Sequence, residues 1–526
     1  MKLHLALALA AGLALAGGAC APAGAGPTTL RYGLTLAPTG IDPHLNASAE
    51  LGIPLSSVYD TLVYLDPVSG DFAPGLAERW TISDDGLAYT FTLRTDVRFH
   101  DGTPFDAEAV RANVEYVLNP EHHSQKAAAM LGPLDRVEVI DAHTVALHLH
   151  EPFAPLLDSL SQVYLGMASP QALATWGPSE YQFHQVGTGP YRFVEYIAND
   201  HLTIERNPDY AWAPSVYRSS TAQIDRIVFT FYADAATRAL ALEAGEVDVL
   251  GEVPPRDAER LAATGRFTLH AVPIPGQPLQ YFFNTRRPPT DDVRVRQALI
   301  LAVDRAAIVR AVFGALSPAA RGPLSAATLG FAPQAAFPEP DPARAAALLE
   351  QAGWVDDDGD GVRTRSGQPL AVRLVVPPWG SNPEAAQLVQ EAWRAVGARV
   401  ELELVAGFGP LREAQAAGGY NAISLNFFGS DPDLLRAFYA SDGLYNWATL
   451  DDPLIDALLD QAAAETHDAD ARLTHYARFA EQVRDQALIL PIRDYVSLVV
   501  VRAGVEGLTF SAQGWFPNLI DVRLAP

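Results

Sequence analysis

The feature that most constrains the fold is the length of chain that follows residue 29. About 500 residues run from Leu30 to Pro526, whereas a single hydrophobic core stops growing at roughly 250–300 residues. The chain must therefore divide into at least two lobes. Hydrophobic residues make up 49% of the sequence, so each lobe has enough apolar side chains to bury a core of its own.

Strand-like and helix-like stretches alternate along this region, and no short-period repeat interrupts them. Tyr89–Arg94 alternates apolar and polar residues at a period of two, which predicts a strand with one buried face. Val293–Phe313 is helical in pattern, with Asp291 or Asp292 as its N-cap. Farther on, Val372–Val405 contains a strand, a helix and a strand, which is a βαβ unit with parallel strands. The sequence predicts a mixed α/β protein.

Residues 1–19 have the three-part order of an export signal. Lys2 places a positive charge ahead of the apolar run Leu3–Leu15, and small residues follow that run. A membrane-spanning helix needs about 20 apolar residues, so the run is too short to be one. We predict a lipoprotein-type signal peptide at residues 1–19 and a tether at residues 20–29, where small residues, Pro and Gly bury nothing.

Cys20 is the only cysteine in the chain, so it has no partner for an internal disulfide. It follows Gly18 and Ala19 in a stretch that resembles a bacterial lipoprotein signal, although Gly17 stands where Leu is usual. The resemblance implies that Cys20 becomes a lipidated N-terminus with more than one acyl chain, which gives stable membrane attachment. The protein would then lie on the outer face of the cytoplasmic membrane or in the periplasm. The alternative is an ordinary cleaved signal with an incidental cysteine.

Charge and motif content exclude several classes of function. The formal net charge of −25 would repel nucleic acids and anionic membrane surfaces. No nucleophile elbow, His-Glu-x-x-His helix or Walker-type loop is present. We therefore predict a protein that is not an enzyme and carries no cofactor or resident metal. A secreted hydrolase built on a pair of carboxylates is the remaining enzymatic alternative.

An ordered series of motifs resembles family 5 of the extracytoplasmic solute-binding proteins, which serve dipeptide, oligopeptide and nickel importers. The most specific stretch runs from Pro74 to Phe105 and contains PGLAERW, YTFTLR and VRFHDGTPF. Supporting stretches are Gly187–Tyr191, Glu205–Tyr210 and Ala244–Asp248. The resemblance extends from Leu30 to the C-terminus, and most of these residues have the character of scaffold rather than of ligand contacts.

The resemblance implies a class II clamp like that of periplasmic binding proteins, with two α/β lobes and an extra subdomain. Lobe one would comprise residues 30–276, with the subdomain at about 55–185. Lobe two would comprise residues 277–496, and residues 497–526 would return to lobe one. Two crossovers form a hinge, and a bound solute favours the closed state. A monomer of this kind would capture a peptide-like ligand and deliver it to the permease subunits of an ABC importer.

The resemblance also implies a position for ligand recognition. In peptide-binding members, an Asp in a lobe-two loop meets the free α-amino group, and such a charge-assisted bond selects for the cation. Asp431 is the best match, in the loop Asn426–Asp433. Phe replaces the usual Trp there, and the loop is shortened before Asp431. Asp431 as a plain helix cap is the alternative, and the altered loop keeps a sugar, an opine-like compound or a nickel chelate open as the solute.

Six further side chains are candidates to line the same cleft, because aromatic walls suit a variable organic ligand. For each aromatic residue the alternative is ordinary core packing. The candidates are Phe427, Phe428, Asn446, Trp447, Tyr281 and Phe283.

Two groups of residues invite a metal interpretation. Asp356–Gly361 matches the start of a calcium loop, but Gly367 stands at the twelfth position, where a bidentate Glu is needed. We favour a polar turn between two apolar segments. His148 and His150 share one face of a strand without a familiar ligand set nearby. Surface histidines are the preferred interpretation, with a nickel ligand as the alternative because some family members handle that metal.

Overall fold

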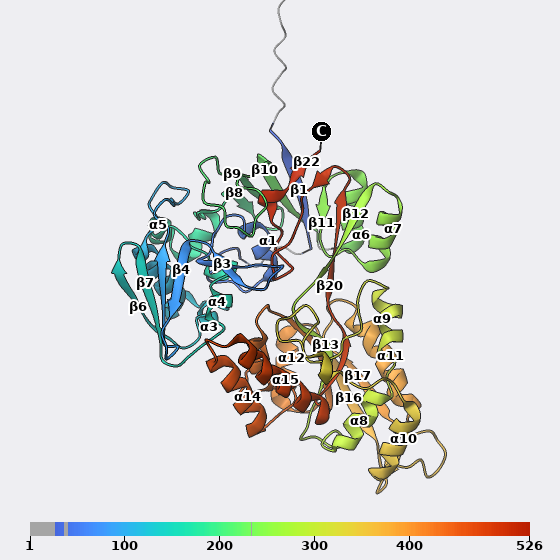
Figure 1. Cartoon of the computed structure of the whole chain (residues 1–526). Coiled ribbons are helices and arrows are strands. Elements are labelled where there is room, and N and C mark those ends of the chain that lie inside the picture. Colours follow the sequence, from blue (N-terminus) through green and yellow to red (C-terminus); the bar gives the residue numbers. More distant parts are fainter. Residues whose placement is uncertain (1–26, 36–39, 233, 526) are drawn as a thin grey trace, which may run out of the picture.

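The computed structural model describes residues 27–35, 40–232 and 234–525. The predicted signal peptide and Cys20 lie outside this part of the chain. Figure 1 shows two bodies, one above the other, joined by a narrow waist, with a smaller body beside the upper one. Within the described ranges, no helix is both long and apolar enough to cross a membrane.

The upper body, lobe one, is built on a seven-stranded mixed sheet flanked by helices (Figure 1). In spatial order its strands are β12 (Phe267–Pro273), β20 (Val496–Arg502), β11 (Val249–Leu250), β1 (Thr29–Leu34), β10 (Arg226–Phe231), β9 (His201–Arg206) and β8 (Tyr191–Ile197). Its helices include α1 (Gly52–Leu55), α6 (Ala235–Ala244) and α7 (Pro255–Ala263), and a short pair, β21 (Val505–Glu506) and β22 (Arg523–Leu524), lies near the C-terminus. The strand β1 is parallel to β10 and β11, whereas β20 is antiparallel to β11.

The smaller body is a subdomain with a four-stranded antiparallel sheet. Its strands are β4 (Ala77–Ile82), β5 (Ala88–Leu93), β7 (Thr144–Leu149) and β6 (Leu134–Asp141), and its helices are α2 (Ala107–Leu118), α3 (Ala127–Met130), α4 (Leu156–Ser159) and α5 (Pro170–Glu180). A hairpin of β2 (Val63–Leu65) and β3 (Phe72–Pro74) adjoins it. Tyr89, Phe91 and Leu93 of β5 are buried and alternate with less buried residues, which confirms the predicted strand and its buried face.

Lobe two, the lower body, contains a five-stranded sheet in the order β17 (Arg399–Leu404), β16 (Ala371–Val376), β18 (Ala422–Phe428), β13 (Gly276–Phe283) and β19 (Ile489–Arg493). Its helices are α8 (Val293–Leu301), α9 (Arg305–Phe313), α10 (Pro342–Gln351), α11 (Asn382–Ala395), α12 (Phe408–Ala417), α13 (Arg436–Tyr439), α14 (Pro453–Ala464) and α15 (Ala469–Asp485). The hairpin β14 (Thr364–Arg365) and β15 (Gln368–Pro369) lies outside the main sheet. The parallel pairing of β16 and β17 around α11 confirms the predicted βαβ unit.

Two short segments connect the lobes. The chain leaves the lobe-one sheet at the end of β12 and enters the lobe-two sheet at the start of β13, and it returns between β19 and β20. The two segments lie side by side, since the backbone N–H of Ile274 donates to the carbonyl oxygen of Tyr495 at 3.0 Å. Two adjacent crossovers form a hinge that can rotate while each core stays intact.

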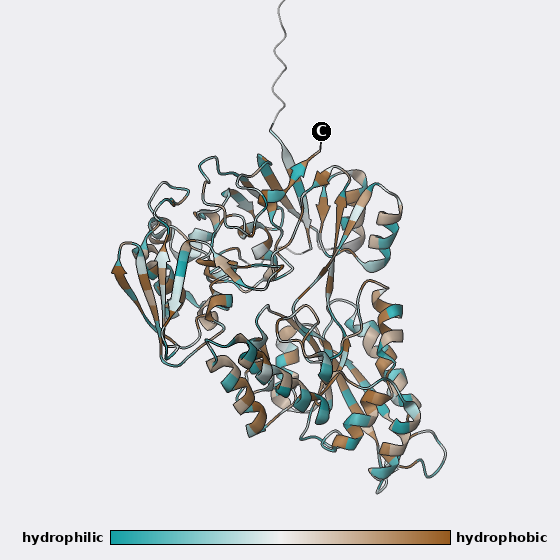
Figure 2. Ribbon diagram, in the orientation of Figure 1, coloured by the Kyte–Doolittle hydropathy of each residue, from teal (hydrophilic) through white to brown (hydrophobic). Residues whose placement is uncertain are grey.

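The core of lobe two is separate from the cores of lobe one. One cluster of buried hydrophobic side chains joins the subdomain to the large sheet of lobe one, and a second cluster lies wholly within residues 279–492. Figure 2 shows hydrophobic residues (brown) on the central strands of both lobes. Each lobe therefore has its own core, as the length of the chain predicts.

Candidate functional site

The two large sheets present their carboxyl ends to each other across the hinge. In lobe two, β16, β17 and β18 are parallel, and Phe428 at the end of β18 pairs with Gly276, the first residue of β13 after the hinge. In lobe one, β1, β10 and β11 run antiparallel to β20, which begins at the hinge. The loops that follow six parallel strands therefore face one region. Such loops at the carboxyl ends of open α/β sheets are where ligands bind.

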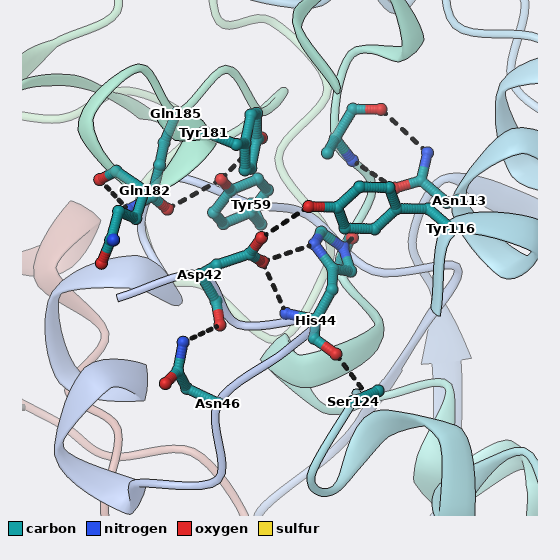
Figure 3. A network of polar contacts seen from close by, with 12 residues as sticks. Asp42, His44, Asn46, Tyr59, Asn113, Tyr116, Ser124, Tyr181, Gln182 and Gln185 are labelled. Atoms are coloured by element: carbon teal, nitrogen blue, oxygen red, sulfur yellow. Dashed lines mark hydrogen bonds and ion pairs between the residues drawn. The ribbon is translucent and has the colours of Figure 1, made fainter. Parts of the chain in front are cut away.

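A buried polar network fixes residues 41–46 in lobe one. The Asp42 carboxylate accepts hydrogen bonds from the His44 backbone N–H (2.9 Å) and from the Tyr116 hydroxyl (3.0 Å). The ring of His44 reaches the Gly166 carbonyl oxygen at 2.7 Å, and Ser124 Oγ donates to the His44 carbonyl oxygen at 2.6 Å. Figure 3 shows how these side chains converge from separate segments of lobe one. The network holds residues 42–46 in place facing the hinge region.

Figure 3 also shows a second group of hydrogen-bonded side chains, which holds the residue before Asp42. The Tyr59 hydroxyl donates to Gln185 Oε1 and shares a hydrogen bond with Tyr181, each at 2.8 Å. Gln185 in turn donates to the Ile41 carbonyl oxygen at 2.9 Å. Buried polar groups that are paired in this way rigidify their surroundings, so residues 41–46 are held firmly against the rest of lobe one.

Asp431 lies at the hinge-facing edge of lobe two, but its charge is already matched. Arg472 on α15 donates two hydrogen bonds to its two oxygens, at 2.8 and 2.7 Å, and both side chains are about nine-tenths buried. Burial alone would lower the pKa of Arg472, but the charge of Asp431 and its hydrogen bonds raise it above the ordinary arginine value. Asp431 also accepts from the Asp433 N–H at 2.7 Å and caps the 3₁₀ turn Pro432–Leu435. The structure thus shows the capping role together with an ion pair that the sequence did not indicate.

Phe428 links the two lobes through an aromatic cluster at the hinge. Its ring centroid lies 4.9 Å from that of Tyr495 and 5.0 Å from that of Trp515, which belongs to the C-terminal segment of lobe one. The Tyr495 hydroxyl donates to Glu252 Oε1 at 2.7 Å, and Glu252 lies in the loop after β11. Burial raises the pKa of Glu252. We call Phe428, Tyr495 and Trp515 the hinge cluster.

Phe427 points to the opposite side of β18 and lies on an exposed aromatic surface. Its side chain is 37% exposed and packs 5.1 Å from Phe438 and 6.1 Å from Tyr445, measured between ring centroids. Phe408, which begins α12, is 40% exposed and lies 5.7 Å from Tyr445. Phe408 follows β17, so these rings lie near the carboxyl ends of β17 and β18, the two strands that flank β16 in the sheet. Phe408 and Tyr445 were not among the sequence candidates.

Three of the predicted aromatic contacts are core residues instead. Tyr281, Phe283 and Trp447 have no exposed surface, and Tyr281 and Phe283 pack against Trp393 at centroid distances of 6.4 and 6.0 Å. Every residue of β13 is buried, because the strand is internal to the sheet and covered on both faces. These side chains offer a solute no surface in this conformation, so the prediction that they line the cleft is corrected to core packing.

Asn446 anchors its own loop. Its Nδ2 donates to the carbonyl oxygens of Ser441 (3.2 Å) and Leu450 (2.9 Å), and its Oδ1 accepts from the Leu450 N–H at 2.8 Å. The side chain also borders a surface hollow of about 560 Å³ that Arg286 and Arg412 share. Arg286 follows the end of β13 that lies away from the hinge, so this hollow is separate from the region between the sheets.

Charged groups of both lobes meet beside the hinge, between α4 and the loop that follows β18. Asp158 of lobe one accepts a hydrogen bond from Ser430 Oγ of lobe two at 2.5 Å. Burial and then the charge of Asp431 raise the pKa of Asp158 to about 7. Nearby, the ammonium of Lys126 lies 3.8 Å from the centre of the Tyr164 ring. None of these groups was predicted to contact a ligand or the other lobe.

Lys126 is a half-buried cation that packs over an aromatic ring. Among the described residues no carboxylate oxygen lies within 4.0 Å of its ammonium, and burial lowers the pKa of Lys126 to about 8, against the raising effect of Asp158. The sequence contained a signal for this residue that was overlooked. Apart from Lys2, it is the only lysine of a chain rich in arginine.

The acidic run after α10 forms an exposed turn. The carboxylates of Asp356, Asp358 and Asp360 lie within 4.8 Å of one another. Asp356 accepts hydrogen bonds from the backbone N–H groups of Gly359 (2.8 Å) and Gly361 (3.2 Å). The run thus forms a turn held by its own side chains, which is the interpretation we favoured from the sequence.

His148 of β7 and His150, one residue beyond its end, make separate surface ion pairs. His148 Nε2 lies 2.7 Å from Glu138, and His150 Nε2 lies 3.4 Å from Asp135. Both partners are exposed carboxylates on β6. Each ring therefore has its own surface partner, as expected for surface histidines.

Comparisons of the sequence and of the structure with known proteins indicate the same family. Residues 71–448 match the family described as bacterial extracellular solute-binding proteins, family 5. The chain is 30% identical over 489 residues to the nickel-binding periplasmic protein of Escherichia coli, with 88% of each chain covered. It is 29% identical to di/tripeptide-binding protein 2 of Pseudomonas aeruginosa, with 80% of each covered. Among solved structures, NikA from Brucella suis in complex with Fe(III)-EDTA superposes with a TM-score of 0.84 at 27% identity, covering 94% of this chain and 99% of that one.

Proposed function

The chain belongs to family 5 of the bacterial extracellular solute-binding proteins, the substrate-binding components of ABC importers, and from this premise we propose that it closes its two lobes around a peptide-like solute. It then presents that solute to the permease subunits of its importer. The fold is the two-lobe clamp of this family. The members act outside the cytoplasm as transport components without catalytic activity.

The observation that carries this proposal is the placement of the two sheets. Their carboxyl ends face each other across a hinge of two adjacent segments. A solute held there touches both lobes at once, so it binds the closed state more tightly than the open state. Differential affinity of this kind is what shifts the population toward closure.

Several side chains support an organic solute with a carboxylate. Phe408 and Phe427 supply exposed aromatic surface at the carboxyl edge of lobe two. Lys126 is a half-buried cation that can give a charge-assisted hydrogen bond to a carboxylate such as the C-terminus of a peptide. Asp431 holds the guanidinium of Arg472, so it acts on the solute as a positioning residue for that cation. The peptide-binding relative supports the same class of ligand.

A metal chelate is the second candidate. The relative with 30% identity is named for nickel, and the solved structure with a TM-score of 0.84 holds Fe(III)-EDTA. A chelate that carries several carboxylates needs cations around it, and this chain places Lys126 and Arg472 on opposite lobes near the same point. In that version the metal is part of the solute and needs no protein ligand.

Thermal unfolding distinguishes the two candidates. A ligand that binds only the folded state stabilises it by about 2.7 kcal/mol at 100 times its Kd, which raises Tm measurably. We expect stabilisation by members of a library of two- to six-residue peptides. No shift with any peptide, together with a clear shift with Ni(II)-histidine or Fe(III)-EDTA, would replace the peptide by the chelate. Fe(III) and Ni(II) salts without chelator are the matched controls, because a metal ion that binds directly would act alone.

We infer that the protein is exported and tethered by Cys20, and that it works as a monomer. The order of charge, apolar run and small residues before Cys20 supports export, and closure of a two-lobe clamp needs only one chain. Metabolic labelling with a fatty-acid analogue checks the anchor, which Cys20→Ser should abolish while export continues. Light scattering of the mature protein checks the oligomeric state, for which we expect the mass of one chain.

A further inference from the structure

The two lobes touch along a line that begins beside the hinge cluster, which we call the interlobe seam, and we call the form in which these contacts are made the closed form. Ser430 Oγ of lobe two donates to Asp158 Oδ1 of the subdomain at 2.5 Å. The backbone N–H of Ala154 donates to the Ala463 carbonyl oxygen at 2.7 Å, and His467 Nε2 lies 3.0 Å from the Ser83 carbonyl oxygen. In Figure 1 the seam lies where α3 and α4 approach α14.

Of the three seam contacts named above, the hydrogen bond from Ser430 to Asp158 joins two side chains, whereas the other two involve backbone atoms. Charged groups of both lobes surround this bond. Asp158 is 5% exposed, and its second oxygen accepts from Gln162 Nε2 at 2.8 Å. The carboxylate of Asp431 repels its charge, and Arg472 attracts it less strongly because that guanidinium is committed to Asp431. Lys126 is the charged group that faces Asp158 from its own lobe.

Opening of the seam removes the influences that shift the pKa of Asp158. The carboxyl group regains water, loses Ser430 and moves away from Asp431, so its pKa returns toward the ordinary aspartate value of about 3.9. In the closed form, burial and the charge of Asp431 raise the pKa of Asp158 to about 7. The closed form therefore binds the proton more tightly than the open form. The resulting stabilisation of the closed form is fully present below about pH 4 and is lost as the pH rises through about 7.

We propose that Asp158 and Ser430 form a proton-dependent latch across the seam, which holds the clamp closed when the Asp158 carboxyl is protonated and releases it when the carboxyl ionises. The latch deepens the proposed function, because it takes lobe closure as the state that retains the solute. It also makes retention sensitive to the pH outside the cytoplasm, whatever the solute is.

Two other titratable groups, Lys126 and His467, have to be separated from Asp158. Burial lowers the pKa of Lys126 to about 8, inside the pH range of the test, and Lys126→Met removes this group. The ring of His467, three residues beyond the end of α14, contacts the Ser83 carbonyl oxygen of lobe one. His467→Gln replaces the ring and keeps a hydrogen-bond donor at this position.

The latch is tested by the distance between the lobes in protein without any solute. Nitroxide labels at Val68→Cys in lobe one and Leu454→Cys on α14 are exposed and outside the seam, and Cys20→Ser in the full chain removes the native thiol. Pulsed electron–electron double resonance then gives the closed and open populations between pH 5 and pH 8.5. We expect the ratio of closed to open to fall by on the order of ten- to a hundredfold between pH 5 and about pH 7, and to level off above that.

Substitutions assign the effect to its residues. Asp158→Asn should keep the clamp closed at every pH, because the amide is neutral and still accepts from Ser430. His467→Gln and Asp135→Asn, which removes an exposed carboxylate of the same subdomain, should keep the pH dependence of the parent. Ser430→Ala should lower the closed population several-fold at pH 5, and this variant removes one hydroxyl without burying anything new.

Three outcomes would overturn the latch. They are a closed population that does not change with pH in the parent, a pH dependence that survives Asp158→Asn, and a closed population at pH 5 that Ser430→Ala leaves unchanged. Because no solute is present, these outcomes are independent of the peptide library. A failure of peptides to bind would overturn the proposed ligand and leave the latch measurement unaffected.

Discussion

The hinge cluster and the interlobe seam both join the lobes, but they do so with different kinds of contact. At the hinge, Phe428 meets Tyr495 and Trp515 through ring faces and edges 4.9–5.7 Å apart. At the seam, Asp158 meets Ser430 through a hydrogen bond of 2.5 Å. Apolar contact is non-directional and survives a change of angle, whereas a hydrogen bond weakens steeply when its angle is lost.

This difference matches what each region has to do when the clamp moves. The hinge cluster lies where the lobes rotate, and its half-buried rings make contacts that tolerate rotation. The seam has to separate, and a few polar bonds can be exchanged for bonds to water at a small net cost of about 1 kcal/mol each. A seam of large apolar side chains would instead expose apolar surface in every open state. Substitutions in the hinge cluster, the apolar side of the interlobe contact, and in the seam, its polar side, should therefore have different effects.

The largest effect is expected at the pair of Arg472 and Asp431 beside the seam, where a largely buried charge would lose its counter-ion. Arg472→Met leaves a carboxylate that is 11% exposed without its cation, and breaking a buried pair in this way costs about 3–5 kcal/mol. Denaturant unfolding monitored by circular dichroism measures the loss. Arg136→Met is the matched control, because its pair with Asp135 is exposed and should contribute about 0–1 kcal/mol. Similar losses in the two variants would contradict the comparison.

The sequence predicted the elements whose pattern is local. Tyr89, Phe91 and Leu93 alternate along one strand, and the βαβ unit around α11 follows from three adjacent periodic segments. One local element was predicted incorrectly. Val293–Phe313 is two helices, α8 and α9, because the Asp304 side chain accepts from the Ala307 N–H at 2.9 Å and starts a new helix. An N-cap signal was present in the sequence, but the continuous apolar pattern concealed it.

The candidate site was much harder to predict, because its contacts are not local. Arg472 is 41 residues from Asp431, and Ser430 is 272 residues from Asp158, so no spacing rule connects them. Tyr281 illustrates the opposite error. Its aromatic character fits a ligand wall as well as a core, and only the position of β13 inside the sheet decides for the core. Burial on two faces is a property of the assembled sheet and not of the strand's own residues.

The next largest effect is expected on solute affinity, because the charge of the solute should be recognised by the polar groups near the seam. Lys126→Met removes the ammonium and keeps the apolar stem, so the binding of a carboxylate-bearing solute should weaken by about ten- to a hundredfold, the worth of a hydrogen bond to a charged group. Calorimetry with the solute that stabilises the parent most measures this. Arg136→Met should leave the affinity unchanged, since Arg136 is an exposed residue of the subdomain.

The same residue gives a direct pH measurement. In protein that lacks the first 19 residues, carbon-13 lysine labelling produces one set of side-chain signals, from Lys126. Burial lowers the pKa of Lys126 to about 8, so we expect the signals to titrate there and not near the ordinary value of about 10.4. A bound carboxylate favours the charged form and should move the midpoint upward. A downward shift on binding would show that the solute's charge is not at this position.

A smaller effect is expected on the apolar side. Phe428→Ala removes the ring that joins the lobes, and because Phe428 is only partly buried the loss of folding stability should be about 2 kcal/mol, below the range for fully buried rings. The stronger readout is the hinge itself, since the environment of Trp515 changes and its fluorescence should shift. Phe427→Ala is the matched control, one residue away and 37% exposed, and it should leave Trp515 unaffected. Equal changes of Trp515 fluorescence in Phe428→Ala and Phe427→Ala would contradict the contact of Phe428 with the hinge cluster.

The smallest effect is expected from Ser430→Ala, and it separates closure from folding. The hydroxyl makes one hydrogen bond to the other lobe, so its loss should change the free energy of unfolding of each lobe by less than about 1 kcal/mol, whereas the closed population at pH 5 should fall several-fold. Denaturant unfolding and the interlobe distance measure the two quantities on the same protein. If both change in proportion, the seam is part of the folded core; if closure alone changes, the polar side is a detachable contact, and the hinge cluster alone keeps the lobes together when the clamp opens.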